Sequence, residues 1–229
     1  MDCLVTRTLF DFNSFRQSID GENQVQNSDV ISFDVFDTLL SRTLVTQENT
    51  WRNYSSCFFV FRLIAEKLAR HLHLSFRSRE VTIDQIYRYM PKRYLPLEEL
   101  EREKKMIQVD LDIEETILKL QSSGKKIILI SDTYYSATNL RYLLNSARFN
   151  LDSIEIFSSC EYGMSKCNGL FTVVKNSLSL EYGAWIHIGD NLNADHSAPQ
   201  ALGITSLIYT NHVNWFLKSN ILSRRGMSK

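Results

Sequence analysis

The pattern of apolar residues changes twice along the chain. Short continuous apolar runs occur near residue 30 and again after residue 125, whereas the segment between them has its apolar residues at helical spacing. Continuous runs are typical of strands that are buried on both faces of a parallel sheet. We predict such strands at residues 30–33, 127–130, 154–157, 184–188 and 205–209. Helical spacing separates the later runs, at residues 137–146, 170–178 and 194–202.

The alternation of strands and helices predicts an α/β fold with a Rossmann-like, mainly parallel sheet and right-handed crossovers. The helical segment after the first strand is too long for a crossover, so it is predicted to be an inserted helical cap domain. We assign residues 1–28 to an N-terminal lead-in, 29–44 and 121–229 to the catalytic core, and 45–120 to the cap. Within the cap, helices are predicted from Thr46, at residues 81–87 with Thr82 as the capping residue, and at residues 98–109 and 113–120.

Asp34 follows the first apolar run directly. Ligands of open α/β sheets bind at the carboxyl ends of the strands, so this carboxylate is a candidate functional group. On this stretch alone, a turn residue or a helix-capping Asp after a core strand is an alternative of equal weight. Residues farther along the chain are needed to decide between the two interpretations.

Reactive side chains also follow later predicted strands. Ser131, Lys166 and Asp190 each come after one of them, and Asp195 lies shortly beyond Asp190. Each residue alone has a structural explanation as a turn residue, a surface lysine or a helix N-cap. Together, a carboxylate, a hydroxyl, an ammonium and a pair of acids suit phosphoryl transfer, which depends on positioning and charge neutralisation. Their joint occurrence at strand ends favours a catalytic site.

Composition narrows the classes of partner. Lys and Arg together number 26, as do Asp and Glu, so the charge balance indicates neither nucleic acid nor an acidic membrane as a partner. The apolar stretch at residues 57–65 is broken by Arg62 and is too short to span a bilayer. We expect reduced, mostly buried thiols and a cytoplasmic protein, because no CxxC pair or zinc-like spacing occurs among Cys3, Cys57, Cys160 and Cys167.

The residues at the strand ends resemble the four dispersed motifs of the haloacid dehalogenase-like hydrolases. Residues 33–39 resemble the first motif with FDVFDTL, and residues 130–132 resemble the second with ISD. Lys166, with GLF at residues 169–171, resembles the third motif, and residues 188–195 resemble the fourth with IGDNLNAD. The resemblance covers roughly residues 29–210, and the insertion corresponds to a type C1 helical cap. A bacterial branch associated with surface-polysaccharide and glycosyltransferase genes is resembled further at residues 36–40, 62–66 and 86–87.

This resemblance implies a phosphatase-like hydrolase of a small phosphorylated metabolite, a sugar phosphate among the candidates. Asp34 would attack phosphorus and form an aspartyl-phosphate. Ser131 and Asp132 would contact the phosphoryl group, and Lys166 would neutralise both the nucleophile and the transferred group. The cap would close over the leaving group and select the substrate.

The resemblance also implies a Mg²⁺ cofactor. Its ligands would be the Asp34 carboxylate, the backbone carbonyl of Phe36 and the Asp190 carboxylate, with Asp195 in support. Mg²⁺ prefers oxygen ligands of this kind, together with retained waters.

Phe36 departs from the phosphatase pattern, which has a second Asp two residues after the nucleophile. A phenyl ring cannot transfer a proton, and general acid–base help contributes about 10²–10⁴-fold to rate. The sequence leaves open whether Asp37 or a cap residue such as Glu66 replaces the missing acid.

Two other function classes follow from this departure. Dehalogenases of the family also have a non-acid at that position and need no metal, whereas Asp190 and Asp195 favour the metal-dependent phosphatase. The third class is a weakened module that binds a phosphorylated ligand or a partner. The physiological substrate, the turnover rate and the oligomeric state are not determined by the sequence.

Overall fold

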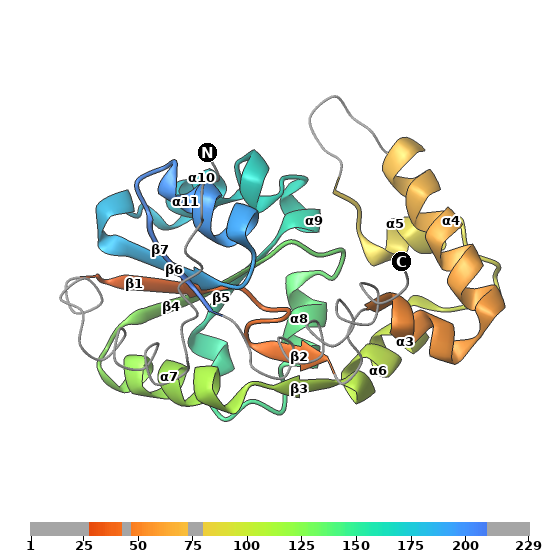
Figure 1. The fold of residues 1–229 in the computed structure, drawn as a ribbon, viewed down its shortest axis with the longest axis horizontal. Helices are drawn as coiled ribbons and strands as arrows, with labels where there is room; N and C mark the ends of the chain where they lie inside the picture. The colour runs from red at the N-terminus through yellow and green to blue at the C-terminus, as the bar shows by residue number, and fades with distance from the viewer. Residues whose placement is uncertain (1–27, 43–46, 73–79, 210–229) are drawn as a thin grey trace, which may run out of the picture.

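A computed structural model describes residues 28–42, 47–72 and 80–209. Within these residues the core is a parallel sheet with the strand order β5-β4-β1-β6-β7 (Figure 1). Its strands are β1 (Val30–Phe33), β4 (Lys126–Ser131), β5 (Glu155–Ser158), β6 (Trp185–Gly189) and β7 (Thr205–Ile208). The predicted α/β, Rossmann-like fold class is confirmed. The predicted lead-in up to residue 27, the tail beyond residue 209 and Cys3 lie outside the described residues.

The central strand β1 is buried along its whole length, between β4 and β6. Successive side chains of a strand point to opposite faces, so the apolar run supplies both sides of the sheet. Val30 joins one buried cluster with Ile128 and Ile130, and Ile31 joins the other. Continuous hydrophobicity therefore reflects a strand with a covered face on each side.

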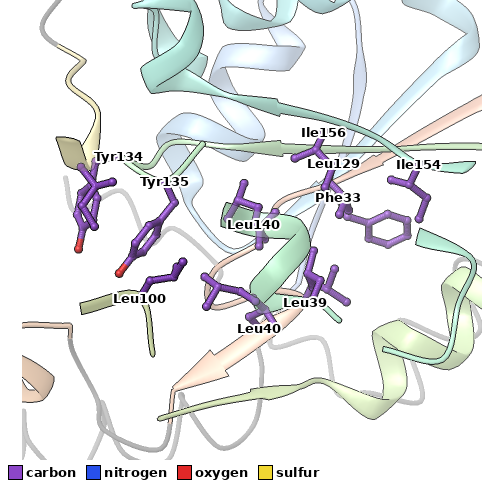
Figure 2. Packing of buried hydrophobic residues seen from close by; sticks show 14 of the residues in the cluster. Phe33, Leu39, Leu40, Leu100, Leu129, Tyr134, Tyr135, Leu140, Ile154 and Ile156 are labelled. Carbon is purple, nitrogen blue, oxygen red and sulfur yellow. The ribbon is translucent and has the colours of Figure 1, made fainter. Parts of the chain in front are cut away.

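Helices cover both faces of the sheet (Figure 1). One face packs against α7 (Leu111–Ser122) and α8 (Ala137–Leu143), and Figure 2 shows Phe33, Leu129 and Ile156 near Leu140 of α8. The other face packs against α10 (Leu170–Leu178), through Leu170, Phe171 and Val174. The short segments on this side are α9 (Ser159–Tyr162), α11 (Ala198–Gln200), η2 (Lys166–Asn168) and η4 (Leu192–Ser197). Two 3₁₀ turns, η1 (Leu151–Ser153) and η3 (Tyr182–Ala184), precede β5 and β6.

The inserted helices lie to one side of the sheet (Figure 1). They are α3 (Gln47–Tyr54), α4 (Ser56–Leu72), α5 (Ile83–Tyr87) and α6 (Pro96–Met106). Thr82 is the N-cap of α5, as predicted: its Oγ1 accepts the Gln85 N–H at 3.2 Å, and the Gln85 side chain accepts the Thr82 N–H at 2.9 Å. This reciprocal capping box satisfies two backbone donors at the start of a very short helix.

The structure differs from the predicted helices at two places. The helix predicted at 98–109 ends at Met106, because its last residues form β3 (Ile107–Val109), antiparallel to β2 (Leu40–Arg42). The predicted insertion also included the helix that is α7. In the structure α7 packs on the core sheet, where Ile113 and Ile117 are fully buried. An amphipathic pattern specifies that a helix has a buried face, but not which element covers it.

Two expectations from composition have different outcomes among the described residues. Cys160 is buried, but Cys57 and Cys167 are exposed, so the expectation of mostly buried thiols is wrong. Over residues 28–42, 47–72 and 80–209, no helix has both the length and the apolar character needed to cross a bilayer.

Candidate active site

The parallel topology brings the predicted site residues to one edge of the sheet. Asp34 follows β1, Ser131 ends the neighbouring strand β4, and Asp190 follows β6 on the other side. The Asp34 N–H donates to the Ile188 carbonyl at 2.8 Å, which extends the β1–β6 pairing as far as this residue. The side chains of Asp34 and Ser131 are both buried. Adjacent strand ends therefore place a carboxylate and a hydroxyl side by side, as expected for this fold.

Lys166 connects the acidic residues of the site. It lies in η2 and is almost fully buried. Its ammonium donates to Oδ1 of Asp34 and, at 2.5 Å, to Oδ1 of Asp195. Its backbone N–H donates to Oδ1 of Asp132 at 2.8 Å, so the Asp132 carboxylate positions the lysine loop. Direct contact of Asp132 with the phosphoryl group stays a prediction.

The carboxylates of Asp34, Asp190 and Asp195 offer oxygens that all lie within 4.8 Å of one another. Burial raises the pKa of Asp34 well above its ordinary value, against the attraction of Lys166 and with added repulsion from the other two acids. Burial lowers the pKa of Lys166, but Asp34 and Asp195 outweigh it, so the lysine pKa is raised and the side chain is an ammonium. Three carboxylates around one ammonium carry excess negative charge. This set of hard oxygen donors fits a Mg²⁺ ion.

Asp195 accepts hydrogen bonds through both of its carboxylate oxygens. Oδ1 accepts from His187 Nε2 at 3.0 Å as well as from Lys166, and Oδ2 accepts the Asn191 N–H at 2.9 Å. Burial raises the pKa of Asp195, but Lys166 and His187 outweigh it and hold the pKa well below its usual range. A Cβ at Gly189 would lie 2.4 Å from Cγ of Asp195, so this carboxylate packs directly on the glycine backbone.

The segment that carries Asp195 is not the regular helix predicted at 194–202. It consists of the π-helical η4 followed by α11. Single π-helical turns occur frequently at functional sites. The Asp195 N–H donates to the Asn191 carbonyl at 2.8 Å, and the Asn191 side chain caps the start of the segment. Spacing of apolar residues does not distinguish one helical winding from another, which is why the sequence missed it.

Phe36 lies two residues beyond Asp34, in the turn that follows β1. Its ring is half-buried, with the Arg42 guanidinium carbon 4.4 Å from the ring centroid and the Tyr135 ring at 6.1 Å. The Arg42 Nε donates to Glu103 of α6 at 2.7 Å. Asp37 has a φ of 65° and opens a tight turn back to Leu40. The Phe36 ring is therefore packed between groups of the core and a cation that the cap holds.

The cap contacts the core through a buried polar network that the sequence analysis did not detect. Glu99 of α6 accepts hydrogen bonds from Arg62 Nε at 2.7 Å, Tyr134 OH at 2.7 Å and Tyr87 OH at 2.9 Å. The Arg62 guanidinium carbon also lies 4.6 Å from the Tyr134 ring centroid. Tyr134 belongs to the loop after Ser131, and Figure 2 shows it with Tyr135 near Leu100 of α6. Charge scattered along a helix gave no sign of this burial.

Glu66, the cap acid considered as a proton donor, belongs to the same network. Its carboxylate accepts from Arg62 Nη1 at 3.0 Å and from Arg70 Nε at 2.9 Å. Both of its carboxylate oxygens therefore already accept hydrogen bonds from guanidinium groups within the cap. The structure therefore gives Glu66 an ion-pairing role.

No family model matches the sequence, and no curated protein matches it significantly. Solved structures do match. An HAD family enzyme from Bacteroides thetaiotaomicron, in complex with magnesium and inorganic phosphate, has a TM-score of 0.58 at 16% identity, covering 81% of this chain and 96% of that one. A predicted HAD-like family hydrolase from Porphyromonas gingivalis has a TM-score of 0.59 at 17% identity, covering 86% and 98%. L-2-haloacid dehalogenase from Xanthobacter autotrophicus has a TM-score of 0.57 at 11% identity, covering 86% and 83%.

These matches show that the chain has the fold of haloacid dehalogenase-like enzymes. The resemblance drawn from the four motifs is thereby confirmed at the level of the fold. Identities of this size carry no information on substrate, and the matched structures include both a magnesium and phosphate complex and a dehalogenase.

Proposed function

We propose that the protein is a Mg²⁺-dependent phosphatase-like hydrolase that acts on a small phosphorylated metabolite. The observation that carries the proposal is the Lys166 ammonium, which donates to both Asp34 and Asp195 at the carboxyl edge of the sheet. A nucleophilic carboxylate next to a fixed cation suits attack on an anionic phosphoryl group, because the cation offsets the repulsion between them. A sugar phosphate fits this class of substrate.

In the proposed reaction, an Asp34 oxygen forms a bond to phosphorus as the bond from phosphorus to the leaving oxygen breaks. The leaving group departs with the electron pair, and water then hydrolyses the aspartyl-phosphate to release phosphate and regenerate Asp34. Lys166 stabilises the charge on the transferred group, and the Ser131 hydroxyl donates to a phosphoryl oxygen. Asp132 keeps the Lys166 loop in position through the backbone hydrogen bond.

A bound Mg²⁺ supplies charge neutralisation and orientation of the phosphoryl oxygens. Asp34, Asp190 and the backbone carbonyl of Phe36 would hold it. Asp195 would contribute from a supporting position, because both of its oxygens already accept hydrogen bonds from the protein. The excess negative charge of the cluster supports this assignment, and a structure with the same fold holds magnesium and inorganic phosphate.

Phe36 determines which leaving groups the proposed reaction accepts. Because a phenyl ring donates no proton, the leaving group departs largely unassisted, and the rate depends steeply on leaving-group pKa. Aryl, acyl and other activated phosphates are therefore expected to react faster than alkyl phosphates.

A dehalogenase-type hydrolase is the second candidate, favoured by the same residue. Displacement of halide from carbon needs no leaving-group acid and no metal, and L-2-haloacid dehalogenase shares the fold. The cluster of Asp34, Asp190 and Asp195 argues against it, because a reaction without a metal ion does not require three neighbouring carboxylates. A binding module without turnover is the third candidate. We also propose a cytoplasmic location, since Cys57, Cys160 and Cys167 are free thiols.

A substrate panel separates these candidates. Aryl, acyl and alkyl phosphates and 2-haloacids are incubated with the protein in Mg²⁺ and in excess chelator, and released phosphate and halide are measured. Phosphate release that requires Mg²⁺ is expected. Halide release that persists in chelator identifies a dehalogenase, and ligand binding without any product identifies a binding module.

A further inference from the structure

We propose that Trp185, Ser32 and His187 form a buried positioning chain that orients Asp195 and, through Asp195, the Lys166 ammonium. The inference rests on the proposed function for its catalytic consequence, although the chain itself is defined by contacts outside the reacting groups. None of the three residues is among the groups assigned to the proposed reaction. They are positioning residues rather than catalytic ones.

The chain crosses the two central strands of the sheet. Ser32 of β1 pairs with His187 of β6 in the parallel ladder, and Val30 pairs with Trp185. Trp185 Nε1 donates to Ser32 Oγ at 2.8 Å, Ser32 Oγ lies 2.7 Å from His187 Nδ1, and His187 Nε2 lies 3.0 Å from Asp195 Oδ1. Ser32, His187 and Trp185 are all 0% exposed. The hydrogen bonds therefore run without a gap from the core to the site.

The two ends of the chain determine the position of every proton within it. An indole N–H can only donate, and an ionised carboxylate can only accept. His187 must then carry its proton on Nε2 to donate to Asp195, which leaves Nδ1 as an acceptor for the Ser32 hydroxyl. The Ser32 oxygen in turn accepts from Trp185. For a neutral His187 imidazole, this is the single arrangement that satisfies all three bonds.

Polar side chains at these positions are unusual for a central parallel strand, which is normally apolar on both faces. Buried polar groups destabilise a fold unless each is hydrogen-bonded, so an apolar residue would be the simpler choice for stability alone. Here the hydrogen bonds end on Asp195, a carboxylate that also accepts from Lys166. Such outer interactions orient the groups of a metal site, and their loss typically reduces metal affinity or activity about 10–100-fold.

Asp195 transmits the orientation because its position is fixed from three directions. His187 and Lys166 donate to Oδ1, Asn191 N–H donates to Oδ2, and the Gly189 backbone lies against its Cγ. Loss of the His187 donor leaves Oδ1 with Lys166 alone and lets the carboxylate rotate. The ammonium then loses its fixed alignment with Asp34.

The first test reads the chain directly and needs neither metal nor substrate. Long-range ¹⁵N–¹H NMR of the wild-type protein, with His187→Gln used to assign the resonance, reports which imidazole nitrogen carries the proton. We expect a neutral His187 protonated on Nε2 at neutral pH. In Ser32→Ala, Asp195 should keep the proton on Nε2, and the Nδ1 resonance should shift because its hydroxyl donor is lost. A proton on Nδ1, or an imidazolium, in the wild-type protein overturns the proposal.

The second test measures Mg²⁺ affinity by calorimetry, and kcat and KM on an activated phosphate ester. His187→Leu should weaken Mg²⁺ binding and lower kcat by about 10-fold or more, with little change in KM. His187→Gln retains a donor toward Asp195 and should recover to within about threefold of wild type. The matched control is Ile117→Val, a fully buried apolar change in α7, whose cluster lies apart from that of Trp185. A folded His187→Leu protein that matches this control shows a merely structural role and overturns the proposal.

If His187→Leu does not fold, Ser32→Ala decides the question, because it keeps the imidazole and removes only its hydroxyl partner. An unchanged Nδ1 resonance together with unchanged Mg²⁺ affinity in that variant overturns the proposal. The two proposals also fail separately. A wild-type protein that hydrolyses no ester but shows the expected tautomer and loses Mg²⁺ affinity in His187→Leu contradicts only the proposed function. An active wild-type enzyme with His187 protonated on Nδ1 contradicts only the positioning chain.

Discussion

The carboxyl edge of the sheet and the joint between cap and core both bury charged side chains, but they balance those charges differently. At the sheet edge, Asp34, Asp190 and Asp195 cluster together, and the Lys166 ammonium pairs with Asp34 and Asp195. At the joint, Arg62 pairs with Glu99 and Glu66, Arg70 also pairs with Glu66, and Arg42 pairs with Glu103, so three cations meet three acids. Excess negative charge in a fixed cluster favours the binding of a cation. Charges that are already paired with one another do not need a further ion.

Burial of an ionisable group does not by itself indicate that the group takes part in catalysis. Perturbed pKa values occur at functional sites and also in structural ion-pair networks. Burial and the Glu99 carboxylate raise the pKa of Tyr87 well above its ordinary value, yet Tyr87 only bonds a cap residue. What distinguishes the sheet edge is the unbalanced charge at the ends of adjacent parallel strands.

The largest expected effect is that of Asp34→Asn, which removes the proposed nucleophile. Phosphate release should fall by at least about 10³-fold, because an amide oxygen does not form the covalent intermediate. The fold should persist, because the substitution is isosteric and removes one of the excess negative charges of the cluster. Single-turnover assays and a thermal melt on the same preparation measure both quantities. Near-native turnover in the folded variant would show that the nucleophile is another residue.

Glu99→Gln tests the paired charges at the joint between cap and core. It leaves the buried Arg62 with Glu66 alone, so we expect a loss of about 3 kcal/mol in the free energy of unfolding. Mg²⁺ affinity should stay within about twofold, because Glu99 is not part of the sheet-edge site. The control is Glu115→Gln, an exposed carboxylate 3.9 Å from Lys119, where the loss should be below about 1 kcal/mol. Equal losses in urea melts of the two variants would contradict the buried network.

Asp190→Ala tests the excess negative charge at the carboxyl edge of the sheet. Removing one carboxylate of a small cluster should reduce Mg²⁺ affinity and activity together, by about 10–100-fold, because few other ligands compensate. Calorimetry with Mg²⁺ and initial rates across a Mg²⁺ series give the two numbers. Full activity of the wild type in excess chelator would instead reject metal dependence and favour the dehalogenase.

The smallest expected effect is that of Phe36→Asp, which adds an acid at the position where phosphatases with this fold have one. Turnover of alkyl phosphates should rise about tenfold or more, and that of aryl phosphates little, since only poor leaving groups need a proton. The gain requires the new carboxylate to avoid capture by Arg42, whose guanidinium lies over the Phe36 ring.

The matched measurement for this variant is a series of phosphate esters on both proteins, with a melt of each. A flat dependence on leaving-group pKa in the wild type would show that another group is already the acid. A large drop in melting temperature without any gain would show that Phe36 serves only to pack the joint.

The sequence by itself was sufficient for the sheet, because continuous apolar runs such as the one before Asp34 are a local property. It was also sufficient for the candidate residues at the strand ends, because parallel strands must bring their carboxyl ends to one edge. Thr82 as the cap of α5 followed from local hydrogen-bonding chemistry for the same reason.

Only the tertiary structure decided which elements meet. Ile107–Val109 became a strand because Leu40–Arg42, far away in the sequence, offered it a partner. Arg62 is buried because Glu99 and Tyr134 reach it from two other segments. His187 acquired a place in the site because Ser32 and Asp195 lie on either side of its ring. Hydrogen bonds and ion pairs act over a few ångströms of space, and the chain pattern specifies such distances only between residues that are neighbours along it.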